Sequence, residues 1–184
     1  VWQPTHILAF AEGPAQISDA FTGLEQALSW SGLEASVRLT DWRIARVSVV
    51  GRDLNWTDRL FGERPIATSP HVEMHLLDMH EQHNAETRRA ALAGYMRAEA
   101  VDVPGFALAQ TNAEVELEVT GILDDVRDWG IAPFLPDWQQ AGGTLRIVGI
   151  RANDGVADLN ATGELALDPQ GYLTGSISID SLGV

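Results

Sequence analysis

The sequence predicts a mainly β fold, and two observations carry this prediction. The first is two-residue alternation of apolar and polar residues within Ala113–Gly121, Ala157–Leu167 and Leu173–Ile179. Successive strand side chains point to opposite faces, so each segment has one apolar face and one polar face. The second is the chemistry of Asn153-Asp154-Gly155 and Asp168-Pro169-Gln170-Gly171, which place asparagine, proline and glycine where tight turns need them. Together they predict an antiparallel sheet with one solvated side.

Earlier parts of the chain show the same alternation in shorter stretches. We expect four further strands there, at Leu24–Trp30, Leu33–Leu39, Ile44–Val50 and Val72–Leu77. Helix is confined to short pieces, of which Pro136–Ala141 is the clearest because Gly142-Gly143 would end it.

The segment Glu86–Ala100 is ambiguous. Its alanines and arginines favour a helix by intrinsic propensity. Its small and apolar residues nevertheless alternate with larger or polar ones from Leu92 onward, up to the break at Val103-Pro104-Gly105. We therefore predict a strand over Leu92–Val101, preceded by a loop or a helical turn.

These elements predict a single β-rich domain spanning residues 1–184. Its architecture is a long twisted, curled antiparallel sheet of about eight strands, with one or two short helices on the apolar face. A sheet of that length must curl, cover its apolar face, or bind something there.

The charge balance limits the classes of partner. Acidic residues number 26 and lysine plus arginine 12, which gives a formal net charge of -14. This charge repels a phosphate backbone, and no basic cluster offsets it, so we expect no nucleic-acid partner. No apolar run approaches the roughly 18 residues of a membrane span. The start Val1-Trp2-Gln3-Pro4 lacks the basic and apolar regions of a signal peptide.

Histidines supply the only candidate metal chemistry. Four of the five lie between His71 and His83. On a strand, His71, Glu73 and His75 share one face, and two imidazoles with a carboxylate could bind zinc or a redox metal. The alternative is the polar face of an amphipathic strand that is followed by a polar loop.

Carboxylates show no diagnostic catalytic arrangement. Glu114, Glu116 and Glu118 fit a solvated sheet face, and because like charges in a row repel, we expect cationic side chains on a neighbouring strand. Asp124-Asp125 predicts a turn or the start of a helix. The sequence contains no nucleophile elbow, Walker loop or dinucleotide fingerprint. We therefore expect no enzymatic activity, no catalytic residues and no cofactor.

Several motifs together resemble a known bacterial family. The run Trp138–Leu145 contains a tryptophan and a glycine pair, Ala161–Asp168 contains a G-x-L-x-L-D turn, and Gly171–Gly175 contains a G-x-L-x-G strand. His6–Phe10 and Leu28–Leu39 look like the same family. The chain is similar over most of its length to the alphaproteobacterial domain of unknown function 2125 family, and loosely similar to AsmA-type envelope proteins.

This resemblance implies a periplasmic envelope protein, anchored to the inner membrane through a segment outside this chain. AsmA-type sheets form apolar grooves for lipid, so the leading functional hypothesis is a non-enzymatic module that holds lipid or another apolar ligand. The candidate ligand contacts are Leu159, Leu165, Leu173 and Ile177. One alternative is a structural or assembly subunit that docks a partner protein through its acidic or apolar face. Another is a metal-binding protein that uses the His71–His83 cluster.

Overall fold

A computed structural model shows one unclosed antiparallel sheet of eleven strands. It describes residues 5–19, 21–60, 62–106, 108–131 and 133–183. The strands are β1 (His6–Ala11), β2 (Ala15–Asp19), β3 (Leu24–Ser29), β4 (Gly32–Thr40), β5 (Arg43–Asp58), β6 (Arg64–Asp78), β7 (Arg89–Val103), β8 (Leu108–Leu123), β9 (Thr144–Asn153), β10 (Asp158–Leu167) and β11 (Leu173–Leu182). The helices are α1 (Phe134–Gln140) and the single 3-10 turns η1 (His80–Gln82), η2 (Pro104–Phe106) and η3 (Val126–Asp128).

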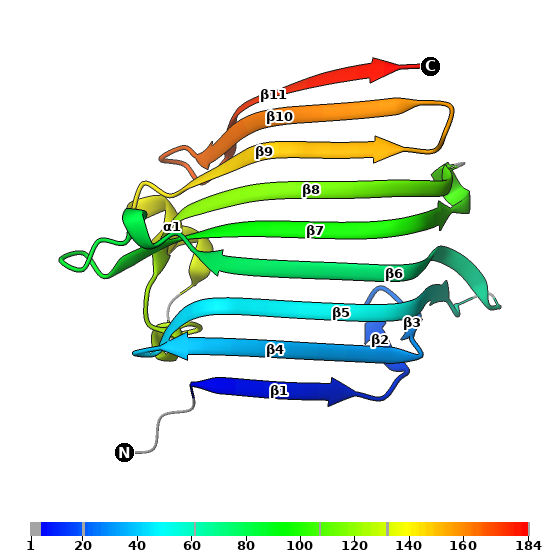
Figure 1. Ribbon diagram of the computed structural model, residues 1–184, viewed down its shortest axis with the longest axis horizontal. Coiled ribbons are helices and arrows are strands. Elements are labelled where there is room, and N and C mark those ends of the chain that lie inside the picture. The colour runs from blue at the N-terminus through cyan, green and yellow to red at the C-terminus, as the bar shows by residue number, and fades with distance from the viewer. Residues whose placement is uncertain (1–4, 20, 61, 107, 132, 184) are drawn as a thin grey trace.

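The strand order is simple. From β4 to β11 every strand pairs with its neighbour in sequence, while β1 forms the opposite edge beside β4 (Figure 1). The hairpin of β2 and β3 branches off this path, because β3 pairs with the far end of the long strand β5. None of the helices in the described part of the chain has the length and hydropathy that a membrane-spanning helix requires.

The predicted fold class is confirmed, although eleven strands form where about eight were expected. The three additional strands had weak patterns. β1 is apolar at nearly every position, β2 has only five residues, and a register shift in the pairing of β9 with β8 interrupts its alternation. The ambiguous segment forms β7, so tertiary pairing overrides its helix propensity. The helix expected at Pro136–Ala141 forms as α1, which begins two residues earlier and ends one residue earlier than predicted.

The predicted turns also form. Gly171 has a φ of 83°, its N–H donates to the carbonyl of Asp168, and the Asp168 side chain accepts from Gln170 and Tyr172. Gly155 has a φ of 86°, a conformation that favours glycine. These two turns connect β9 to β10 and β10 to β11, and they set the register of the C-terminal strands.

The segment between β8 and β9 packs on the sheet at one end of the strands (Figure 1). Below it lies a hydrophobic cluster of Leu39, Ile44, Leu92 and Ile122, against which Val126 packs. Trp138 of α1 is 6% exposed, and its indole N–H donates to the carbonyl of Thr120 at 2.7 Å. This end of the sheet therefore has a packed core.

Candidate functional site

One face of the sheet is apolar across nine strands. Following the paired residues from β1 to β11 gives three adjacent rows, which we call the apolar face. The first row contains Ile7, Val37, Val47, Leu76, Gly94, Leu117, Ile147, Gly163 and Ile177. The second contains Ala9, Ala35, Val49, Met74, Met96, Val115, Ile150, Ala161 and Ile179. The third contains Ala11, Leu33, Gly51, Val72, Ala98, Ala113, Ala152, Leu159 and Ser181. Ser181 is the one polar side chain in these rows.

Large side chains on this face remain open to solvent. Met74 and Met96 lie opposite each other at the centre of the sheet, and each is 38% exposed. Ile177 and Ile179 of β11 are 47% and 64% exposed. Among the described residues, no large side chain is less than 2% exposed. The described residues therefore place no second layer over these four side chains, and an exposed apolar surface of this kind is typical of a binding site.

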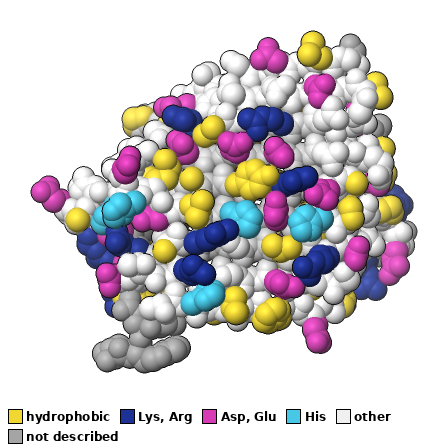
Figure 2. All heavy atoms as spheres, in the orientation of Figure 1, with side chains coloured by type: hydrophobic (Ala, Val, Ile, Leu, Met, Phe, Trp, Pro, Cys, Tyr) yellow, Lys and Arg dark blue, Asp and Glu magenta, His cyan; other side chains and the backbone are white. Residues whose placement is uncertain are grey.

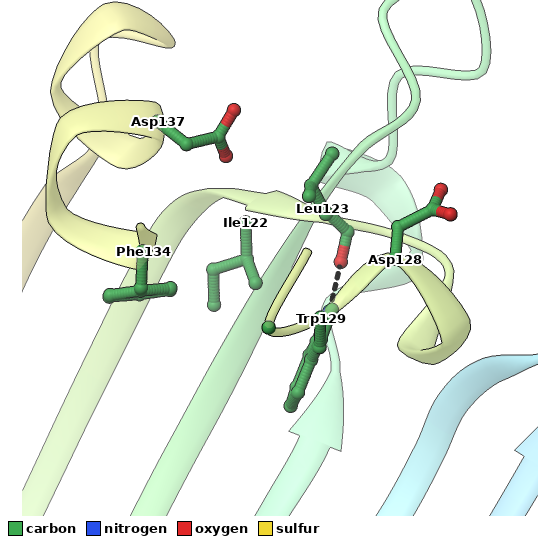
Figure 3. Close-up of a pocket in the computed structure, with 7 residues that line it drawn as sticks. Ile122, Leu123, Asp128, Trp129, Phe134 and Asp137 are labelled. Carbon is green, nitrogen blue, oxygen red and sulfur yellow. Dashed lines mark hydrogen bonds between the residues drawn. The ribbon is translucent and has the colours of Figure 1, made fainter. Parts of the chain in front are cut away.

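A pocket of about 220 Å³ lies on the same side of the sheet, where β8 ends (Figure 3). We call it the aromatic pocket, and it is lined by Ile122, Leu123, Asp128, Trp129, Gly130, Phe134 and Asp137. In Figure 3 the rings of Trp129 and Phe134 flank Ile122, while the carboxylates of Asp128 and Asp137 lie on the other side of the strand end. Ile122 also belongs to the hydrophobic cluster, which connects the pocket to the apolar face.

Both carboxylates that line this pocket are hydrogen-bonded to arginine side chains. Asp137 accepts two hydrogen bonds from the Arg89 guanidinium, at 2.6 and 2.9 Å, and these bonds lower the pKa of Asp137. Asp128 accepts from Arg88 at 2.7 Å. The indole N–H of Trp129 donates to the carbonyl of Leu123 at 2.9 Å, which fixes the ring (Figure 3). The rings of Trp129 and Phe134 are 44% and 56% exposed, so the pocket offers flat apolar walls to a ligand.

The four residues predicted to contact an apolar ligand share one face of the β10–β11 hairpin. Leu165 pairs with Gly175, and Ile177 pairs with Gly163, in an unbroken register that puts Leu159 and Leu173 on the same side. Leu159, Leu173 and Ile177 are exposed, whereas Leu165 is half-buried. Their contact with a ligand stays a prediction.

The opposite face is polar (Figure 2). One row across its centre runs Glu73, Arg97, Glu114 and Arg151, with charges that alternate in sign. The cationic strand expected beside the glutamates is confirmed as β9. Its Arg146 lies 3.3 Å from Glu118, and its Arg151 lies 2.9 Å from Glu116 and 3.7 Å from Glu114. These exposed ion pairs stabilise little individually, but they offset part of the negative charge of the three glutamates.

His71, Glu73 and His75 lie on this polar face, as predicted. The Glu73 carboxylate is 3.9 Å from Nε2 of His71 and 3.6 Å from Nε2 of His75. The other ring nitrogen of His75 lies 2.9 Å from the Ser48 hydroxyl, and its ring stacks on Tyr95. His75 is therefore held by sheet neighbours.

The other two histidines of the stretch, His80 and His83, do not lie on the polar face with His71 and His75. His83 lies beyond β6, where its Nε2 is 3.1 Å from the Asp124 carboxylate, and His80 begins η1. Within the described ranges no group of three or more histidine, aspartate and glutamate side chains is placed to hold a metal ion. Metal binding at His71, Glu73 and His75 stays a prediction.

Comparison with known proteins identifies the family. The chain matches, over residues 1–184, the model of a family described as an uncharacterized protein conserved in bacteria, DUF2125. The chain belongs to the DUF2125 family. No curated protein and no solved structure matches this DUF2125 chain.

Sequence reasoning on the DUF2125 chain missed the aromatic pocket. Its tryptophans are spread along the sequence, and nothing in their spacing separates Trp129 from those that pack in the core. A signal was nevertheless present: the stretch from Trp129 to Pro136 carries no charge and lies between Asp128 and Asp137. Since surface loops are usually polar, an uncharged loop with two aromatic residues indicates an apolar contact surface.

Asp125 gives the DUF2125 fold a testable pH dependence. Its side chain caps η3 and accepts hydrogen bonds from the Arg127 guanidinium, which lower its pKa from 3.8 to about 2 despite burial. A carboxyl whose pKa is depressed by folding contributes stability above its unfolded pKa, and that stability disappears as the pH falls through the folded value. The contribution of Asp125 is therefore complete only well above the unfolded value of 3.8, from about pH 5, and is progressively lost as the pH falls toward about 2.

We expect Asp125→Asn to lower the free energy of unfolding at pH 6 and to show a smaller decline than the native chain between pH 4 and pH 2. Urea denaturation at a series of pH values measures both effects. Glu81→Gln, at an exposed position in η1, is the matched control and should keep the native pH profile. Parallel profiles for the native chain and Asp125→Asn would contradict this role.

Proposed function

We propose that this DUF2125 domain is a non-enzymatic, membrane-associated module of the bacterial periplasm that holds lipid or another apolar ligand against its apolar face. The observation that carries the proposal is the set of three apolar rows, which cross nine strands and in which large side chains stay exposed at the centre (Met74 and Met96) and on β11 (Ile177 and Ile179). A sheet face that served only as core would be covered by a second layer. Here α1 and η3 pack at one end of the strands, and η2 lies at the opposite end, between β7 and β8 (Figure 1).

The chemistry of the apolar face favours a flexible chain as its ligand. Met74 and Met96 are unbranched and adaptable, so they can follow a ligand that has no fixed shape. Each buried methylene of an acyl chain contributes about 0.8 kcal/mol, and about ten methylenes would therefore provide several kcal/mol. The rows contain no charged group that a ligand would have to desolvate.

The aromatic pocket would hold one end of such a chain. Its volume of about 220 Å³ accommodates several methylenes between the rings of Trp129 and Phe134, with Ile122 as the floor. The nearby carboxylates are already paired with Arg88 and Arg89. The pocket therefore favours the apolar end of a ligand rather than a cationic headgroup.

A fluorescent fatty acid such as cis-parinaric acid tests this function. We expect saturable fluorescence enhancement at micromolar concentration and displacement by a non-fluorescent phospholipid or fatty acid. Native mass spectrometry of the protein purified from its own host should show bound lipid. Absence of both saturable uptake and co-purified lipid would reject the proposal, and would favour a partner protein as the cover of the apolar face.

A further inference from the structure

Among the described residues, no strand pairs with the outer side of β11, which is therefore an open edge of this sheet. It pairs with β10 through ten consecutive residue pairs without a register shift, and it is the outermost strand in Figure 1. All ten of its residues are exposed. Since an antiparallel edge strand carries unpaired N–H and C=O groups along its outer side, it can accept another strand.

This edge lacks the features that usually prevent such pairing. Natural edge strands carry lysines, prolines or bulges, or they are very short. Within β11 there is no basic residue, no proline and no bulge, and the single charged residue is Asp180. The opposite edge, β1, has six residues and is therefore a shorter template.

From this edge we infer that β11 pairs antiparallel with β11 of a second copy of the chain, with the two-fold axis at Ser178. In that register Ile177 lies opposite Ile179 of the other copy, twice by symmetry. Both isoleucines lie on the apolar face, so the pairing covers side chains that are 47% and 64% exposed in the single chain. Asp180 lies opposite Ser176, and no like charges meet.

Other two-fold registers are less complementary. An axis between two residues places the apolar face of one copy beside the polar face of the other, because side chains alternate along a strand. An axis at Asp180 brings two carboxylates directly together, which is destabilising. An axis at Ile177 keeps one isoleucine pair but places Ile179 against Gly175. The axes at Ser178 and Ile177 each pair nine of the ten residues of β11, and of these two only the axis at Ser178 places isoleucine opposite isoleucine twice.

The pairing joins the two apolar faces into one surface. The row that ends at Ile177 in one copy continues into the row that ends at Ile179 in the other. This dimer does not depend on the identity of any ligand, so it can be tested on the chain alone and independently of lipid uptake.

Engineered cysteines test the register, since the chain has no cysteine. Directly opposite Cβ atoms lie about 4.5–5.5 Å apart, so Ser178→Cys should form a covalent dimer under mild oxidation or with a short bismaleimide. Thr174→Cys is the control. In the inferred register its two copies are eight residues apart along the strand, about 27 Å at about 3.4 Å per residue, and should not cross-link. Equal cross-linking of the two variants, or none by Ser178→Cys, would overturn the inference.

Sedimentation of charge variants gives an independent test. We expect the native chain to be a dimer and Ser178→Lys to raise its dissociation constant at least tenfold, because the two lysines would face each other at the axis. Ser176→Lys adds the same charge on the same exposed strand but faces Asp180, so it should dimerise at least as tightly as the native chain. A monomeric native chain, assemblies larger than dimers, or equal weakening by both lysines would each contradict this arrangement.

Discussion

Replacing Gly143 by alanine is expected to lower the free energy of unfolding by about 2–4 kcal/mol. A Cβ at this position would overlap the indole of Trp138, including Nε1 and Cδ1, and would lie 2.6 Å from Cε2. Trp138 is buried, and its indole N–H is bonded to Thr120, so the ring cannot move aside without breaking that bond. Overpacking costs typically 1–3 kcal/mol, and a lost hydrogen bond adds about 1 kcal/mol.

Thermal or urea unfolding measures this loss, and Gly105→Ala is the matched control. A Cβ at Gly105 has open space around it, so this variant should unfold as the native chain does. Native-like stability of Gly143→Ala would show that α1 can leave the sheet without cost. In that case the packed end of the sheet would not depend on the contact between Trp138 and the glycine pair.

Replacing Met96 by aspartate is expected to reduce the affinity for an apolar probe by about 10- to 100-fold. The carboxylate would lie at the centre of the second row, directly opposite Met74, where a bound chain would bury it. An uncompensated buried polar group costs about 1–3 kcal/mol. Met96 is 38% exposed, so in the absence of ligand the new carboxylate remains hydrated and the fold is retained.

The control for Met96→Asp is Arg97→Asp, one residue away on the polar face. Both positions are exposed, and both variants introduce the same side chain. Titration with cis-parinaric acid should show near-native affinity for Arg97→Asp and strong loss for Met96→Asp, with unchanged far-ultraviolet circular dichroism for both. An equal effect of the two variants would place the binding site elsewhere, because only one of them alters the apolar face.

Local sequence patterns predicted the strands and their faces well where one face of the sheet is exposed to solvent. Leu165 and Ile177 could be assigned to the same face from alternation alone, and the turn at Asp168 followed from its proline and glycine. The glutamates of β8 even predicted the arginines on the neighbouring strand. In each case the information is contained in a few adjacent residues, which is why it can be read without knowing the fold.

The missed features depend on residues far apart in sequence. β1 shows no alternation, and its place beside β4 follows from pairing across more than twenty residues. The aromatic pocket requires α1 and η3 to fold back on the end of β8, held by Arg89 and Asp137. The sequence of the histidine stretch likewise did not reveal that His83, which lies beyond the end of β6, contacts the carboxylate of Asp124. Only tertiary structure places these groups.

The strand order also determines how the length of this protein can change. Because each strand from β4 to β11 pairs with its sequence neighbour, a β-hairpin can be added or removed at the C-terminal side without rethreading the chain. Each hairpin widens the sheet by two interstrand spacings, about 9.5 Å. The span of the apolar face therefore scales with the number of hairpins, and insertion or deletion of a single short gene segment would adjust it in discrete steps.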